Sequence, residues 1–199
     1  MIREDSIRNV MASILSCGHD FNFRSGVIEK RISKSEYFSA VENDLDECVL
    51  YTPLRKILNS FYYDVDVTKW KYRIYNECAW LSELYLKIQR QTKLTFEAIF
   101  VYLPIEEGFK LFTVYHEMDF EHSIDLFRER YAKHSILWSV MKRKQISISE
   151  LSIYCGLSYS MVYALRQRKK NICKVAAENL YRISKYLGLK IETLLCDSK

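Results

Sequence analysis

The chain has 199 residues, of which 49% are hydrophobic, and a formal net charge of +5. That length has room for one large or two small domains, and a content of only five glycines and two prolines is typical of a helix-rich protein. No apolar run approaches the ~20 residues that span a bilayer, and the start Met1-Ile-Arg-Glu-Asp5 lacks the apolar core of a secretion signal. We therefore expect a cytoplasmic protein with no membrane partner.

The six cysteines are scattered along the chain, and no C-x-x-C pair occurs among them. Most have apolar neighbours, which predicts reduced thiols that fill the core of a cytosolic protein. We expect no metal site and no cofactor.

The first 131 residues are predicted to form a helical domain. Apolar stripes and capping signals indicate helices over residues 1–16, 33–48, 53–63, 70–92, 95–102, 104–115 and 119–131. The segment 18–26 has the composition of a loop, and Thr68 is placed to cap the helix at 70–92. That helix is the longest and has a wide apolar face, which suits a central position.

The segment His116-Glu-Met-Asp-Phe-Glu-His122 is the strongest candidate for metal or acid–base chemistry. A metalloprotease helix needs two histidines four residues apart on one face, whereas these two are six apart. Asp119 is better placed to cap the helix that follows it. We expect no catalytic residues, although an enzymatic domain joined to a second, binding domain is an alternative that a polar cleft near His116 and Asp119 would support.

Tyrosine is frequent, with fifteen residues, and the pair Tyr62–Tyr63 suggests a pocket for a small effector molecule. The competing interpretation is that tyrosines on helix faces bury their rings and keep the hydroxyl in water.

Two short helices joined by a tight corner are predicted between Ser147 and Gln167. Ser147 and Glu150 form the S-x-x-E pattern of a capping box, and a helix follows over residues 148–155. Gly156 falls where the chain turns sharply, because glycine reaches positive φ without a Cβ clash. Ser158 is placed to cap a second helix that extends to about Arg166.

The second of these helices has an apolar side and a polar, basic side. Met161, Val162 and Leu165 are spaced to face inward, whereas the outward residues are polar and lead into Arg168, Lys169 and Lys170. From His134 onward the chain has twelve basic and four acidic residues, a net charge of +8, whereas the first 133 residues have 18 basic and 21 acidic residues, a net charge of −3. A basic C-terminal part is suited to a polyanion, because each neutralised phosphate releases counterions.

Residues 132–196 resemble the Cro/C1-type (XRE-like) helix-turn-helix of bacterial and phage repressors. The resemblance includes the first helix at 136–144, the later helix with Ala176, Glu178, Leu180, Ile183 and Leu187, and the ending 188–195. Ile148 replaces the glutamine that often opens the family's second helix, and the neighbouring Ser149 is placed to make its backbone contact. Arg166 and Arg168 replace a glutamate and a glycine that commonly end the recognition helix.

The resemblance implies an all-α protein with a helical domain at 1–131 and a lambda-repressor-like DNA-binding domain at 132–199. We expect a sequence-specific transcriptional regulator that acts on double-stranded DNA as a repressor and as a homodimer. The residues expected to face base edges are Ser158, Tyr159, Ser160, Tyr163 and Gln167. The residues expected to contact phosphates are Ser149, Arg166, Arg168, Lys169 and Lys170.

Two alternatives remain, one for the helical corner and one for the N-terminal domain. A glycine-containing helical corner also occurs as a plain hairpin within a larger bundle. The N-terminal domain has a scatter of aromatics between Trp80 and Phe127 that is faintly similar to helical proteins of toxin–antitoxin-like gene clusters. An antitoxin would bind a toxin partner through residues 1–131 and regulate its own operon through the DNA-binding domain.

Overall fold

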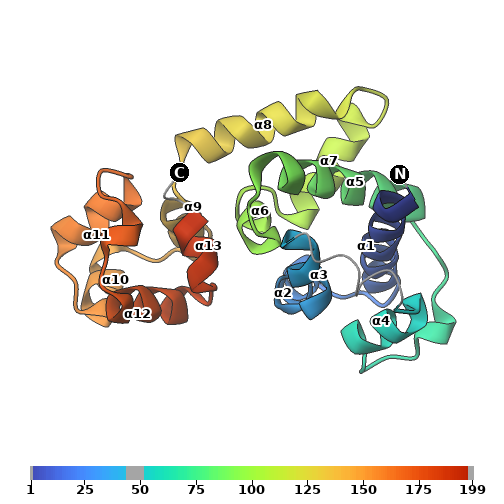
Figure 1. Cartoon of the computed structure of the whole chain (residues 1–199), viewed down its shortest axis with the longest axis horizontal. Helices are drawn as coiled ribbons and strands as arrows, with labels where there is room; N and C mark the ends of the chain where they lie inside the picture. Colours follow the sequence, from blue (N-terminus) through green and yellow to red (C-terminus); the bar gives the residue numbers. More distant parts are fainter. Residues whose placement is uncertain (1, 44–51, 197–199) are drawn as a thin grey trace. The chain divides into compact units, whose positions relative to one another are not determined.

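The computed structural model describes residues 2–43 and 52–196, and all regular elements in these two ranges are helices (Figure 1). The all-α fold class predicted from the sequence is confirmed. The chain divides into two compact units, residues 1–125 and residues 126–199, and the division falls within a single helix, α8. None of the described helices is long and apolar enough to cross a membrane.

Unit 1 contains seven α-helices, a short 3₁₀ helix and the start of an eighth α-helix among its described residues. They are α1 (Ile2–Asp20), α2 (Ser25–Lys34), α3 (Glu36–Glu42), α4 (Leu54–Phe61), η2 (Val67–Lys69), α5 (Tyr75–Thr92), α6 (Phe96–Tyr102), α7 (Ile105–Tyr115) and α8 (Phe120–Lys133). Thr95 caps α6 through its side chain, and Pro104 lies immediately before α7, as predicted.

Helix α5 is the centre of unit 1 because its apolar face packs against α1, α6 and α7. Leu81, Leu84 and Tyr85 are fully buried on this face. The Tyr85 hydroxyl donates a hydrogen bond to the Leu103 carbonyl at 3.1 Å, and burial raises the pKa of this phenol well above its usual value. Gly108 lets α7 approach closely, since a Cβ at this position would collide with the Leu81 side chain.

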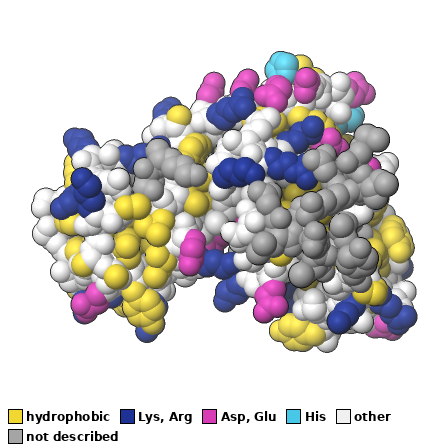
Figure 2. Space-filling view, in the orientation of Figure 1, with side chains coloured by type: hydrophobic (Ala, Val, Ile, Leu, Met, Phe, Trp, Pro, Cys, Tyr) yellow, Lys and Arg dark blue, Asp and Glu magenta, His cyan; other side chains and the backbone are white. Residues whose placement is uncertain are grey.

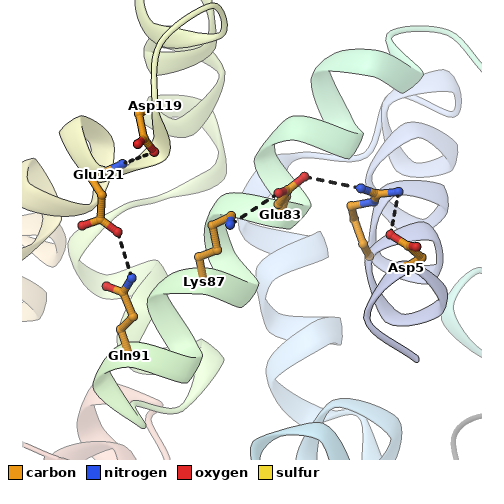
Figure 3. Close-up of polar contacts among 7 residues, drawn as sticks. Asp5, Glu83, Lys87, Gln91, Asp119 and Glu121 are labelled. Carbon is orange, nitrogen blue, oxygen red and sulfur yellow. Dashed lines mark hydrogen bonds and ion pairs between the residues drawn. The ribbon is translucent and has the colours of Figure 1, made fainter. Parts of the chain in front are cut away.

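Polar contacts occur on the more exposed sides of α1 and α5 and at the start of α8 (Figure 3). The guanidinium of Arg8 on α1 lies 3.4 Å from the Glu83 carboxylate on α5 and 3.1 Å from Asp5. At the start of α8 the Asp119 carboxylate accepts the backbone N–H of Glu121, which is the capping role predicted for Asp119. The ion pairs of Arg8 are partly exposed, so each of them contributes little to stability.

Three predicted boundaries in unit 1 were wrong. Helix α1 continues through Gly18 to Asp20, so the predicted loop is shorter, and α2 begins within it at Ser25. The helix predicted from residue 33 is interrupted at Ser35, where α2 ends and α3 begins. Residues 44–48 of that prediction lie outside the described ranges.

The third wrong boundary is the start of α5 at Tyr75 instead of residue 70. The residues before it are bound to the end of α1: the Trp70 indole N–H donates to Ser16, and the Asp20 carboxylate accepts the backbone N–H of Lys71 at 2.8 Å. These bonds compete with the helical conformation. Thr68 does not cap α5; Asp66 caps η2 by accepting the Thr68 backbone N–H.

Among its described residues, unit 2 continues from the end of α8 through five α-helices and a 3₁₀ helix. They are α9 (Ile136–Lys144), α10 (Ile148–Cys155), α11 (Tyr159–Arg166), η3 (Ile172–Lys174), α12 (Ala177–Leu187) and α13 (Ile191–Leu195). Helix α10 packs against α11 and α12, and α9 packs against α11 and α13. The helices predicted at 136–144, 148–155 and 158–166 are confirmed.

The core of unit 2 consists of apolar residues contributed by all five helices. Its fully buried members include Ile136, Leu151, Cys155, Val162, Ile183, Leu187 and Leu194. The Cys155 thiol is free and buried, like those of Cys17 and Cys78, and Cys173 is free and exposed. The prediction of buried packing cysteines is therefore confirmed for these three and wrong for Cys173. Cys196 is half-buried, and Cys48 lies outside the described residues.

Candidate functional site

The first turn of α10 is fixed by a complete capping box. The Ser147 hydroxyl accepts the Glu150 backbone N–H at 3.1 Å, and the Glu150 carboxylate accepts the Ser147 backbone N–H at 2.6 Å. The hydrogen bond that the Ser147 backbone N–H donates to the carboxylate is the main cause that holds the pKa of Glu150 below its usual value. Because the folded-state pKa is the lower one, the carboxylate stabilises the fold above the unfolded-state pKa, and this stabilisation is lost as the pH falls through the folded-state pKa.

Replacement of Ser147 by alanine should lower the free energy of unfolding of unit 2 by about 1 kcal/mol, because one N–H at the start of α10 loses its acceptor. Chemical denaturation of the full chain measures this loss. Ser149→Ala, at an exposed position two residues later, is the control and should change the midpoint little. Glu150→Gln should also reduce the loss of stability that acid causes. Equal midpoints for Ser147→Ala and the wild type would contradict the capping role.

The corner between α10 and α11 depends on Gly156, whose φ is +66°. Ser152, one turn earlier, donates its hydroxyl hydrogen to the Leu157 carbonyl and so joins the end of α10 to the corner. On the other side of the corner, the Ser158 hydroxyl accepts the Met161 backbone N–H at 3.2 Å and starts α11. The sequence between Ser147 and Ser158 therefore specifies both helix starts and the turn between them.

The inner side of α11 contains Val162 and Leu165, which are 0% and 4% exposed. Met161, predicted to face inward with them, is only half-buried. The outer side bears Tyr159, Ser160 and Tyr163, and the exposed fractions of the two tyrosines are 56% and 40%. The buried apolar side holds α11 in place, and the exposed polar side is accessible to a partner.

Most of the predicted site residues are accessible to solvent. Ser158, Ser160, Gln167, Lys169, Lys170 and, at the start of α10, Ser149 are also exposed. Ser158 and Ser160 share a hydrogen bond at 3.1 Å, and the Lys169 ammonium lies 5.6 Å from the centre of the Tyr163 ring. In the face drawn in Figure 2, Lys and Arg side chains lie over the α11 region of unit 2.

Arg166 and Arg168 differ from the other basic residues of this group. Arg166 is half-buried, and its backbone carbonyl accepts the Ser135 hydroxyl at the start of α9. The Arg168 guanidinium donates to the carbonyls of Tyr131 at 2.7 Å and Ala132 at 3.1 Å and lies over the Tyr131 ring. Its backbone has a φ of +54°, a conformation in which glycine is favoured.

We expect Arg168→Gln to destabilise unit 2 by about 2 kcal/mol, in the range for hydrogen bonds from a charged donor. Thermal unfolding of the full chain measures the loss. Lys170→Gln is the matched comparison, because Lys170 is exposed and its removal should leave the unfolding temperature almost unchanged. If the two variants unfold at the same temperature, Arg168 does not anchor the turn after α11 to α8.

The His116–His122 segment includes the turn after α7 and the first residues of α8. His116 follows the end of α7, where its imidazole Nδ1 lies 2.9 Å from the Phe112 carbonyl, and His122 lies on α8. Across the described ranges, no group of three or more His, Cys, Asp or Glu side chains is arranged to hold a metal ion.

Comparison with known families identifies the C-terminal part of the chain. Residues 136–198 match the family model of the Cro/C1-type HTH DNA-binding domain. No curated protein and no solved structure matches the chain. The family match extends from the start of α9 past the end of α13 and thus includes the whole helical core of unit 2.

Proposed function

We propose that this chain, whose C-terminal part is a Cro/C1-type HTH DNA-binding domain, is a sequence-specific transcriptional repressor. The observation that carries the proposal is the exposed side of α11, which combines tyrosine, serine and amide groups with neighbouring lysines. A helix of this kind fits the major groove of B-DNA, where base edges present distinct donor and acceptor patterns.

The side chains divide into two roles by position and charge. Tyr159, Ser160, Tyr163 and Gln167 recur at helical spacing on one side of α11 and its last turn, so we assign them, with Ser158, to base edges. Lys169 and Lys170 follow the helix and are exposed, so we assign them to phosphates, which position the helix without reading sequence.

Three further residues lie at the start of α10 and at or just after the end of α11. Ser149 is exposed near the start of α10 and is assigned a phosphate contact there. The Arg168 guanidinium already binds two carbonyls. We therefore assign it to positioning the turn after α11, in place of the phosphate contact expected from the sequence. Half-buried Arg166 keeps a peripheral phosphate role.

Repression requires only that the protein occupies its site on DNA, since a protein bound across a promoter excludes other proteins from it. Operators for helix-turn-helix proteins are usually two-fold symmetric, so we propose a homodimer, with unit 1 as the dimerisation or sensing element and without a catalytic role. Unit 2, counted as residues 126–199, has 15 basic and five acidic residues, whereas residues 1–125 have 15 basic and 20 acidic residues. Unit 1 is thus unsuited to contact DNA itself.

Selection of bound duplexes from a random pool by the full chain tests the proposal. We expect enrichment of an inverted repeat with half-sites about one helical turn apart, and repression of a reporter whose promoter contains that sequence. A pool that remains random after repeated selection at 0.1–0.15 M salt would contradict sequence-specific binding. A selected site that activates the reporter would contradict repression alone.

A further inference from the structure

We propose that unit 1 binds a small aromatic oxyanion in a pocket between α2, α3 and α4. The pocket has a volume of about 850 Å³, within the ~300–1,000 Å³ typical of small-molecule sites. Its described lining comes from one side of α2, from the start of α3 and from α4 with the residues just after it. The inference concerns unit 1 alone and does not depend on the DNA-binding role of unit 2.

The charge of the lining points to an anion. Lys30 and Lys34 on α2 and Lys56 on α4 contribute three exposed ammonium groups, and no described residue forms an ion pair with any of them. Glu36 is the single acidic side chain in the described lining. This basic cluster occurs in a unit in which acidic residues outnumber basic ones by 20 to 15.

The spacing of the lysines is unfavourable without a ligand. Lys30 and Lys34 are one turn apart on α2, and like charges at this spacing destabilise a helix by roughly 0.2–0.5 kcal/mol. A phosphate, sulfonate or carboxylate group bound between them would remove the repulsion and form charge-assisted hydrogen bonds.

Arg31 provides a fixed cation between the lysines of α2 and the end of α4. Its guanidinium donates to the Phe61 carbonyl, lies 3.2 Å from the Asp64 carboxylate and is 4.6 Å from the centre of the Phe23 ring. These contacts hold the guanidinium in one position. Asp64 neutralises part of its charge, so the lysines supply most of the attraction for an anion.

The remaining surface of the pocket is apolar and aromatic. Buried Ile57 and Phe61 form part of it, and Tyr63 at its edge is 81% exposed. The Arg31 guanidinium lies 5.4 Å from the centre of the Tyr63 ring, so a planar ligand body has an exposed aromatic ring to stack against, with a cation beside it. Inorganic phosphate alone would leave this surface unused.

Calorimetric titration of the full chain with 1-naphthyl phosphate tests the inference. We expect saturable binding of one molecule per chain, at least ten times tighter than the binding of neutral 1-naphthol or of inorganic phosphate. Equal affinity for naphthyl phosphate and inorganic phosphate would contradict the aromatic part of the proposal. Equal affinity for the phosphate ester and the naphthol would contradict the anionic part.

Matched variants locate the site. Lys30→Gln combined with Lys34→Gln should weaken binding of 1-naphthyl phosphate at least tenfold. Lys56 lies on α4, and Lys56→Gln should also weaken this binding. The control is Lys69→Gln combined with Lys110→Gln, which removes the same charge at exposed positions outside the pocket and should bind as the wild type does. Equal weakening in the control would mean adsorption to the surface of the chain and would overturn the proposal.

Discussion

Replacement of both Lys169 and Lys170 by glutamate should lower the affinity of the full chain for any duplex DNA by about 100-fold or more at 0.1 M salt. Both side chains are exposed at the end of α11. The logarithm of the binding constant changes by about 0.9 for each phosphate contact per decade of salt concentration. Relative to 1 M salt, each contact therefore contributes roughly eightfold at 0.1 M. Two lost contacts and two new repulsive charges combine to give the predicted effect.

Fluorescence anisotropy with a labelled duplex at several salt concentrations measures this change. The double variant should also show a salt slope shallower by about two units. Lys142→Glu combined with Lys185→Glu is the control, because it makes the same change in net charge on α9 and α12 and should reduce affinity far less. Comparable losses in both double variants would show that only the total charge of unit 2 matters, and would contradict a defined phosphate contact after α11.

Gly156→Val should destabilise unit 2 by about 2–3 kcal/mol. Gly156 has a φ of +66°, and an L-residue in the left-handed conformation costs about 1–2 kcal/mol, with a larger cost for a β-branched side chain. A Cβ at this position would also lie 3.3 Å from the Arg182 guanidinium, which donates to the Cys155 carbonyl. The loss is a large fraction of the stability of a small domain.

Denaturant unfolding followed by circular dichroism measures this effect. Gly156→Asn is the matched variant, because asparagine adopts the left-handed conformation more readily than other residues with a side chain, and it should retain most of the stability. A valine variant as stable as the asparagine variant would mean that the corner between α10 and α11 does not require positive φ.

The sequence specified unit 2 more completely than unit 1. In unit 2 the signals are local: the Ser147–Glu150 capping box, Gly156 at the corner and the Ser158 cap each satisfy backbone groups within a few residues. Such signals are readable without knowledge of the fold. The start of α5 shows the opposite case, because residues 70–73 are held out of the helix by Ser16 and Asp20 at the end of α1.

The candidate sites differ in the same way. The outward residues of α11 followed from helical spacing, whereas the internal bonds of Arg168 could not be foreseen, because Tyr131 and Ala132 are far from it in sequence. One signal in the sequence did mark Arg168 as unusual, because it replaces a glycine that is common at this position in the family. The contribution of Lys30 and Lys34 to the pocket of unit 1 was not predicted, because α2, the helix that contains them, was not predicted as a separate element. Of the pair Tyr62–Tyr63, only Tyr63 lines this pocket, whereas Tyr62 is buried and its hydroxyl donates to the Ile14 carbonyl.

Competition between a selected operator duplex and random duplex tests most directly whether the exposed side of α11 reads base sequence. Tyr163→Ala should lower the preference for the operator by about tenfold, within the range of ~1–3 kcal/mol for a specific base contact, and change binding to random duplex little. Tyr181→Ala is the matched control, since Tyr181 is an exposed tyrosine on α12 whose ring also lies near a lysine, Lys185 at 6.0 Å. It should keep the full preference. An undiminished preference in Tyr163→Ala, or the same loss in both variants, would contradict the assignment of α11 to the major groove.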